Sequence, residues 1–299
     1  MSISEIKRFD GATLAAFCAV AEELSFARAA SRLCISQPPL SRRIRQLEEE
    51  IGTQLFERTT RSVSLTPAGA LMYEHARRIT NEAGQMMANV REMVRGQGGS
   101  LSIGITPSAS VSPLVGHLHK FRLKHPNVSL DLIELDSVQL REEFKYGKLD
   151  LALMRPVSAH SSIEMTVVHA EPLCFVTRKE DALPGGSISP AQLTQYPLIG
   201  YDAERSPYLA NLFKAVVEMS PETPRVVQRS RLPSILTLVE AGVGAALAPR
   251  CLREWRPGVL HFHELVSAPG VTAEMVVARP AGATNPTALA FIGSLLAQK

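Results

Sequence analysis

The sequence lacks a long hydrophobic run and has few cysteines. Nowhere do about 18 apolar residues follow one another, the length that a membrane-spanning helix needs, and the N-terminus has no apolar stretch like that of a secretory signal. The four cysteines, Cys18, Cys34, Cys174 and Cys251, include no CxxC pair, which argues against a zinc site and a disulfide scaffold. We therefore expect a cytoplasmic protein with small core cysteines and no membrane partner.

Motifs for catalysis and cofactor binding are also missing. No GxSxG, HExxH or P-loop pattern is present. The GxG within residues 240–247 lacks a third glycine and follows a predicted helix, where a dinucleotide site requires a strand. His261 and His263 would share one face of a strand, as metal ligands can, but no third ligand stands at a recognisable spacing. We expect no catalytic residue, no cofactor and no metal.

Length and composition indicate an ordered protein of several domains. A chain of 299 residues is long for one core, so two or three domains are expected. Hydrophobic residues make up 45% and charged residues 20%, which excludes general disorder. The net charge of +3 is too small to mark the whole molecule as a nucleic-acid binder, so only its local distribution is informative.

Two short amphipathic helices separated by a few residues are predicted between residues 25 and 51. The first has one apolar face, which consists of Phe26, Ala29, Ala30 and Leu33. The second begins at Ser36, a good N-cap, with prolines in a first turn whose N–H groups would have no intrahelical acceptor. Its apolar stripe, before the C-cap Gly52, consists of Leu40, Ile44, Leu47 and Ile51. With another helix expected over residues 13–24, the spacing predicts a helix-turn-helix.

The second helix has a cationic face opposite its apolar stripe, where Ser41, Arg42 and Arg45 project. Between Arg28 and Arg45 there are five arginines and no acid, a bias that the phosphate backbone of DNA selects for. A basic run alone would indicate only a solvated helix, but on a helix-turn-helix it favours DNA binding.

A wing and a long helix are expected next. Residues 55–66 alternate enough for a small hairpin, which carries Arg58 and Arg61. A Thr-Pro start and the absence of proline before Pro107 predict one helix over residues 67–95. Its apolar residues are spaced as in a coiled-coil seam and are Met72, Ala76, Ile79, Ala83, Met86, Val90 and Met93. We expect this helix to join two copies of the chain; the alternative is a helix that lies on its own domain.

Beyond a glycine-rich linker at residues 96–100, strands and helices alternate. Strands are predicted over residues 101–106, 128–135, 149–155, 174–179, 197–202, 225–229, 244–249 and 275–280. Helices are predicted over residues 111–125, 138–147, near 189, 208–219, 232–241 and 286–298. The βαβαβ order at the start of this part calls for a parallel sheet with right-handed crossovers.

The N-terminal residues also carry a motif, FxxAAxxLxxSQPxLSxxIxxLEEEIGxxLFxR. Its members are Phe26, Ala29, Ala30, Leu33, Ser36, Gln37, Pro38, Leu40, Ser41, Ile44, Leu47, Glu48, Gly52, Leu55, Phe56 and Arg58. It resembles the N-terminal signature of LysR-type transcriptional regulators, and length and layout agree over the whole chain. The stretch SQPPLSRRIRQLEEEIG is most similar to the branch that controls aromatic-compound catabolism.

The resemblance implies an α+β multidomain fold. A winged helix-turn-helix would cover residues 1–66, a linker helix 67–95, a hinge 96–100, and a periplasmic-binding-protein-like α/β effector domain 101–299. In that family two crossovers join two subdomains, and here they fall near Glu171 and Met275. Subdomain I would comprise residues 101–171 and 275–299, and subdomain II residues 172–274. A homotetramer built of two dimers is implied, and RNA polymerase is a further candidate partner.

Eight residues are expected to contact double-stranded operator DNA. Gln37 and Arg42 suit bidentate contacts to adenine and guanine in the major groove. The others, expected beside them or on phosphates, are Ser36, Pro38, Ser41, Arg45, Arg58 and Arg61. A dimer would present two such helices to an inverted repeat.

An effector site is expected where hydroxyl side chains gather at helix starts beyond strand ends. These residues are Thr106, Ser108, Ser110, Ser137 and Ser206. For each serine, helix capping alone is the other possible role. The resemblance matches Ser108, Ser137, Pro207 and Tyr208 to positions that line the effector site, and Arg155 is a candidate to neutralise a second carboxylate. We expect a small, carboxylate-bearing effector.

Three other interpretations are open. A peroxide-sensing branch of the family uses a cysteine pair, so Cys174 and Cys251 define a redox-sensing alternative. An enzyme with a DNA-binding extension would need a nucleophile and a base, and none can be named. A DNA-architectural protein would not need a large α/β domain with a cleft.

Overall fold

The computed structural model describes residues 10–59, 62–94, 98–158, 161–254, 257–268 and 270–297. The chain divides into two units, residues 1–91 with 145–148 and residues 92–144 with 149–299. Within the described ranges, no helix has both the length and the apolar character needed to cross a membrane.

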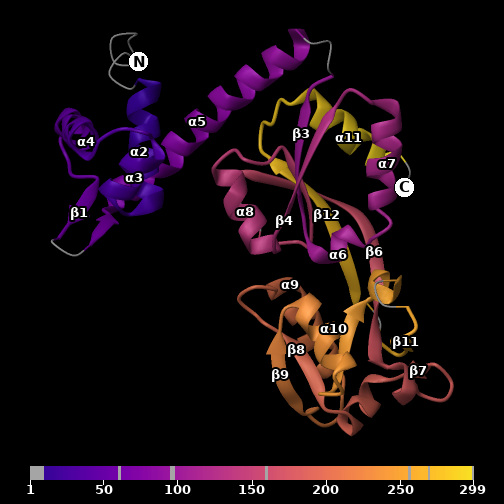
Figure 1. Cartoon of the computed structure of the whole chain (residues 1–299). Helices are drawn as coiled ribbons and strands as arrows, with labels where there is room; N and C mark the ends of the chain where they lie inside the picture. The colour runs from indigo at the N-terminus through magenta and orange to yellow at the C-terminus, as the bar shows by residue number, and fades with distance from the viewer. Residues whose placement is uncertain are drawn as a thin grey trace. The chain divides into compact units, whose positions relative to one another are not determined.

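The first unit is a winged helix-turn-helix followed by a long helix (Figure 1). Its elements are α2 (Gly11–Glu23), α3 (Phe26–Arg32), α4 (Gln37–Ile51), β1 (Phe56–Arg58), β2 (Val63–Leu65) and α5 (Pro67–Val94). The core between the helices and the antiparallel hairpin includes Phe17, Phe26 and Phe56, whose rings pack with centroids 5.4 and 5.9 Å apart. The predicted helices and wing are confirmed.

Local sequence sets the ends of these helices. The Asp10 and Ser25 side chains accept N-cap hydrogen bonds at α2 and α3. Ser36 is the N-cap of α4, as predicted, but its side chain makes no capping hydrogen bond. Gly52 ends α4 with φ of 80°, a left-handed conformation that favours glycine. Gly69 lets α5 start against the wing, because a Cβ there would lie 2.0 Å from the Leu55 carbonyl oxygen.

Subdomain I, in the second unit, is built on the predicted parallel βαβαβ arrangement. It comprises β3 (Ser100–Ile105), α6 (Pro107–Ser110), α7 (Val115–Lys124), β4 (Ser129–Glu134), α8 (Ser137–Lys145) and β5 (Leu151–Met154). The final helix, α11 (Pro286–Leu296), packs with α7 on one face of the sheet, through Phe121 and Phe291, while Leu140 and Phe144 of α8 lie in a separate core cluster. The helix predicted from residue 111 instead starts at Val115, because α6 and a turn precede it.

Subdomain II contains a second parallel group, β8 (Leu198–Tyr201), β9 (Val226–Ser230) and β10 (Ala245–Pro249). Helices α9 (Pro207–Val217) and α10 (Leu232–Glu240) pack on these strands. Short strand β7 (Ser187–Ile188) and strand β11 (Leu260–Leu265) extend the sheet. The remaining turns are the 3-10 helices η1 (Lys179–Asp181), η2 (Pro190–Gln195) and η3 (Arg250–Glu254).

Two long strands connect the subdomains. Strand β6 (Ile163–Arg178) has 16 residues and pairs antiparallel with β12 (Thr272–Pro280) before it continues along β10 and β11. The two strands run side by side from one subdomain to the other (Figure 1). The crossovers expected near Glu171 and Met275 therefore lie in paired strands, and β6 begins well before the predicted strand over residues 174–179.

Candidate functional sites

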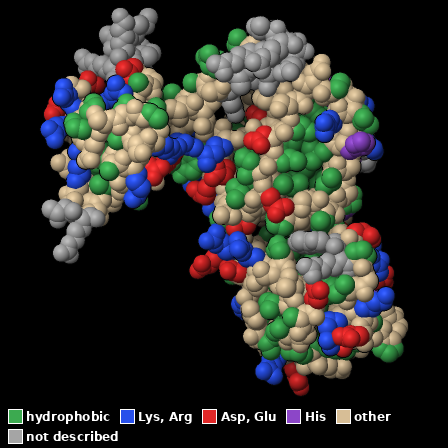
Figure 2. Space-filling model, in the orientation of Figure 1, with side chains coloured by type: hydrophobic (Ala, Val, Ile, Leu, Met, Phe, Trp, Pro, Cys, Tyr) green, Lys and Arg blue, Asp and Glu red, His purple; other side chains and the backbone are tan. Residues whose placement is uncertain are grey.

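Helix α4 turns one face to the core and the other to solvent. Leu40, Ile44 and Leu47 are at most 1% exposed, whereas Ile51, predicted in the same stripe, is 38% exposed at the end of the helix. The opposite face carries exposed Gln37, Pro38, Arg42 and Arg45, with Ser41 partly buried and Ser36 exposed just before the helix. Figure 2 shows Lys and Arg side chains on the surface over α4. This face has the polarity that a DNA groove requires.

The five arginines of the basic stretch are not equivalent. Arg28 pairs with Glu23 at 3.4 Å and Arg32 with Glu22 at 2.6 Å. Arg43 Nη1 lies 3.5 Å from the Ala12 carbonyl oxygen. Within the part of the chain that the structure describes, Arg42 and Arg45 have no side-chain partner. The free positive charge is therefore concentrated on the solvent face of α4.

Arg58, which we expected to contact a phosphate, pairs with Glu48 and remains partly exposed, its side chain being 32% exposed. Its Nη2 lies 2.5 Å from Glu48 Oε2, and the guanidinium stacks 4.7 Å from the Phe26 ring centroid. Oε1 of Glu48 accepts hydrogen bonds from the amides of Leu55 and Phe56 at 3.0 and 3.1 Å. Arg58 thus helps to fix the wing to α4 and α3. Arg61 lies outside the described residues.

The seam predicted along α5 divides into two parts. Met72 and Ala76 pack against the core of their own unit, with Ala76 only 1% exposed, so the coiled-coil interpretation is wrong for these two residues. Ala83 is exposed, and Ile79, Met86 and Val90 are 54–56% exposed although they are apolar. The side chain of Met93 is outside the described set. An exposed stripe on one helix is the kind of surface that a second helix covers.

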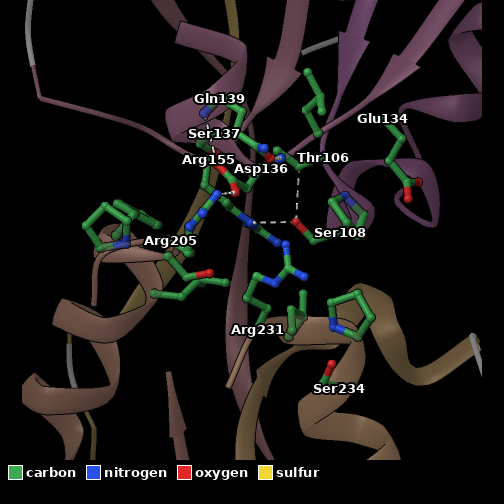
Figure 3. Close-up of a pocket in the computed structure, with 18 of the residues that line it drawn as sticks. Thr106, Ser108, Glu134, Asp136, Ser137, Gln139, Arg155, Arg205, Arg231 and Ser234 are labelled. Atoms are coloured by element: carbon green, nitrogen blue, oxygen red, sulfur yellow. Dashed lines mark hydrogen bonds and ion pairs between the residues drawn. The ribbon is translucent and has the colours of Figure 1, made fainter. Parts of the chain in front are cut away.

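A cavity of about 420 Å³ lies between subdomains I and II. It is lined by the ends of β3, β4 and β5 on one side and by the starts of α9 and α10 on the other (Figure 3). Every predicted effector residue except Ser110 lines it: Thr106, Ser108, Ser137, Arg155, Ser206, Pro207 and Tyr208. Ser110 was wrongly included, because its hydroxyl turns back and donates to the Pro107 carbonyl at 2.9 Å.

Arg155 lies in the cavity wall but is already neutralised. Its side chain is 4% exposed, and Nη2 lies 2.9 Å from Oε1 of Glu171, whose side chain is 3% exposed. Nε donates to Ser108 Oγ at 3.2 Å, and Nη1 donates to the carbonyls of Ala273 and Glu274. The expectation that Arg155 neutralises a second ligand carboxylate is therefore corrected, because Glu171 already balances the charge of this arginine. Arg155 instead joins β5, α6 and the crossover strands.

Two other arginines are better placed to meet an anion. Arg231, the N-cap residue of α10, extends towards Ser108, and among the described residues its guanidinium has no partner (Figure 3). Arg205 stands before α9, where Oδ1 of Asp202 accepts hydrogen bonds from the amides of Glu204 and Arg205. Neither α9 nor α10 has a side-chain cap, so their first amide groups also favour negative charge.

The start of α8 differs from those of α9 and α10. Oδ1 of Asp136 accepts from the Gln139 amide at 2.9 Å and so caps the helix with a carboxylate. Ser137 is then the first helical residue rather than the cap. An anion is favoured less here than at α9 and α10.

Tyr208 lines the cavity, and its hydroxyl contacts β12. The Glu274 amide donates to the hydroxyl at 2.9 Å, and the hydroxyl lies 3.4 Å from the Thr272 carbonyl. Burial is the main cause that raises the pKa of Tyr208. The residue thus links the cavity to a crossover strand.

The thiols in the second unit are poor candidates for redox chemistry. Burial is the main cause that raises the pKa of Cys174 to about 11 and that of Cys251 to about 12. His263 is fully buried, its Nε2 lies 3.0 Å from Thr177 Oγ1, and burial lowers its pKa to about 4. Across the described ranges, no three His, Cys, Asp or Glu residues are grouped to hold a metal ion.

Comparison with known families matches both units. Residues 12–70 match the family described as "Bacterial regulatory helix-turn-helix protein, lysR family", and residues 95–299 match the "LysR substrate binding domain". The chain belongs to the LysR family. A LysR regulator is a DNA-binding transcriptional regulator with an effector-binding domain and not an enzyme, and the resemblance seen in the N-terminal motif is confirmed.

The relatives of this LysR-family chain are named as transcriptional regulators, and the matches cover most of each chain. It is 34% identical to the transcriptional regulator AlsR of Bacillus subtilis, over 78% of each chain. It is 32% identical to the Hca operon transcriptional activator HcaR of Escherichia coli, over 92% of this chain and 93% of HcaR. A crystal structure of full-length CbnR with its target DNA has a TM-score of 0.79 at 25% identity, and the match covers 97% of this chain and 100% of CbnR.

Sequence reasoning missed six polar residues of this regulator's cavity, which are Glu134, Asp136, Gln139, Arg205, Arg231 and Ser234. Three of them, Asp136, Arg205 and Arg231, share one kind of position. Each stands at or just before a helix that follows a strand, the same position that identified Ser108. Helix starts after strands carry charged side chains here as well as hydroxyl groups. Charged residues at these positions would have been found by the same rule.

Proposed function

We propose that this LysR regulator binds an inverted-repeat operator as a dimer and pairs such dimers into a tetramer in the cytoplasm. The free arginines of α4, Arg42 and Arg45, support base and phosphate contacts. The exposed apolar stripe of α5 supports the dimer, and two-fold symmetry then requires a symmetric DNA site. RNA polymerase is the proposed partner through which the bound protein changes transcription.

The proposed signal is a small carboxylate-bearing effector in the cavity between the subdomains. The observation that carries this proposal is Arg231, whose guanidinium has no partner among the described residues and which stands at a helix start without a side-chain cap, in a cavity of about 420 Å³. Ser108 and Ser137 supply hydroxyls on the opposite wall. A cavity of this size with a few polar groups suits a small organic molecule.

A thermal-shift screen of the full-length protein against small organic acids tests the proposal. A bound ligand at 100 times its Kd adds about 2.7 kcal/mol of stability. Ser108→Ala, Ser137→Ala and Arg231→Gln should each lose the response while keeping DNA affinity without effector. Ser110→Ala is the matched control, because that hydroxyl lies outside the cavity.

If Ser110→Ala lost as much of the response as Ser108→Ala, the proposal that the Ser108 and Ser137 hydroxyls bind the effector would be rejected. A screen in which no carboxylate shifts the melting temperature would reject the carboxylate effector itself.

A further inference from the structure

The two walls of the cavity carry charges of opposite sign. Subdomain I contributes Glu134 and Asp136, and subdomain II contributes Arg205 and Arg231. Arg155 adds nothing to this difference, because its charge is balanced by Glu171 at 2.9 Å. A ligand in the cavity therefore faces an acidic wall and a basic wall.

The acidic wall has unused hydrogen-bonding capacity. Oδ2 of Asp136 is buried and receives no hydrogen bond from any described residue, although Oδ1 caps α8. Arg205 Nη1 is 3.7 Å away, beyond hydrogen-bond distance, on a side chain that is 51% exposed. In the described ranges no residue pairs with Glu134, which lies at the end of β4. A buried carboxylate oxygen without a donor is costly, so this wall favours a donor or a cation.

A plain carboxylate would satisfy only the basic wall. Held by Arg231, it would add a negative charge to a cavity that already contains Glu134 and Asp136. If Arg205 turned to the ligand carboxylate, Asp136 would lose the only cation that pairs with it among the described residues, and its Oδ2 would keep no hydrogen-bond donor there. A positive group on the ligand compensates for both effects.

We propose that the effector is zwitterionic, an amino-acid-like molecule with its carboxylate towards Arg231 and Arg205 and its ammonium towards Asp136, while Glu134 adds negative charge to the same wall. This inference rests on the proposed carboxylate effector and narrows it to one chemical class. Charge-assisted hydrogen bonds on both walls then orient the ligand across the cleft and draw the subdomains to it from both sides.

The test is isothermal titration of the full-length protein with matched probes. Each set holds one skeleton constant and changes only the group at C2: one set is 3-phenylpropanoate, phenylalanine and benzylmalonate, and the second is 4-methylpentanoate, leucine and isobutylmalonate. The amino acid should bind at least about tenfold more tightly than the deaminated acid, a difference of about 1.4 kcal/mol. Asp136→Asn with Glu134→Gln should reduce that preference to within about threefold.

Two features keep this test decisive. Asparagine is as good an N-cap as aspartate, so Asp136→Asn should keep the start of α8, and a melting curve checks this. Asp131→Asn, the same change at an exposed residue of β4, is the matched control and should keep the full preference.

Tighter binding of deaminated acids or dicarboxylates would overturn the zwitterion and leave the carboxylate effector standing. A preference that survives in the double variant would also overturn it. Failure of every probe in both sets, and of every carboxylate in the wider screen, would reject both proposals together.

Discussion

Replacing Glu171 with glutamine should destabilise the effector domain far more than its small chemical change suggests. The variant leaves the Arg155 guanidinium buried without a counter-charge, since the two side chains are only 4% and 3% exposed. It also changes the partner of the Cys251 amide, which donates to Glu171 Oε2 at 2.5 Å. Breaking a buried ion pair by removing one partner costs about 3–5 kcal/mol.

That cost is a large share of the roughly 5–15 kcal/mol that stabilises a typical domain. At about 2–4 °C for each kcal/mol in a domain of this size, the Tm should fall by about 6–20 °C. Unfolding in urea, followed by circular dichroism and by the fluorescence of the single tryptophan, measures the change in the free energy of unfolding.

Glu164→Gln is the matched control, because Glu164 is on the same strand and pairs with Arg279 at 2.6 Å in a solvent-exposed pair. An exposed pair contributes at most about 1 kcal/mol. Equal losses in the two variants would refute the conclusion that the Arg155–Glu171 pair is held in a water-poor environment. The double variant Arg155→Met with Glu171→Gln should cost less than the sum of its single changes, because the uncompensated charge is gone.

Three further predictions concern the other surfaces. Arg42→Ala should weaken operator binding by about 1–3 kcal/mol and relax sequence preference in a fluorescence-anisotropy titration, and unchanged selectivity would contradict the proposed contact. Ile79→Glu, which places a charge in the exposed stripe of α5, should dissociate the dimer in light scattering; a dimer that persists would exclude this stripe as the interface. At pH 8 a pKa of about 12 leaves about one Cys251 thiol in 10⁴ ionised, so iodoacetamide should label exposed Cys34 first, and rapid labelling of Cys251 in Cys34→Ser would restore the redox alternative.

The fold was largely predictable because its signals are local. N-caps, prolines in first turns and apolar periodicity placed α4 and α5 to within a residue or two. Residues 163–173 of β6 were not found, since they include charged residues and Pro172, and the partner strand β12 is about a hundred residues later. Pairing between distant segments leaves little trace in a single sequence.

The candidate site also divides into features with a local signal, which were predicted, and features that depend on distant segments, which were not. Ser108 and Ser137 were found from their positions after strands, a local pattern. Whether the Arg155 guanidinium is free or paired depends on Glu171 and on the backbone of Ala273, and only the folded sheet brings these residues to it. Local patterns can therefore show where a charge stands but not whether it is free.

Because the crossover strands β6 and β12 are paired, the chain enters and leaves subdomain II at the same place, and subdomain II is an insertion into subdomain I. The chain leaves subdomain I along β6 and returns along β12, and Pro172 and Thr272 are register partners where it crosses. A segment bounded by these two positions can be exchanged between relatives by two cuts that lie next to each other in space. Such chimaeras would keep the acidic wall and replace the basic one, which offers a direct route to biosensors with altered ligand preference.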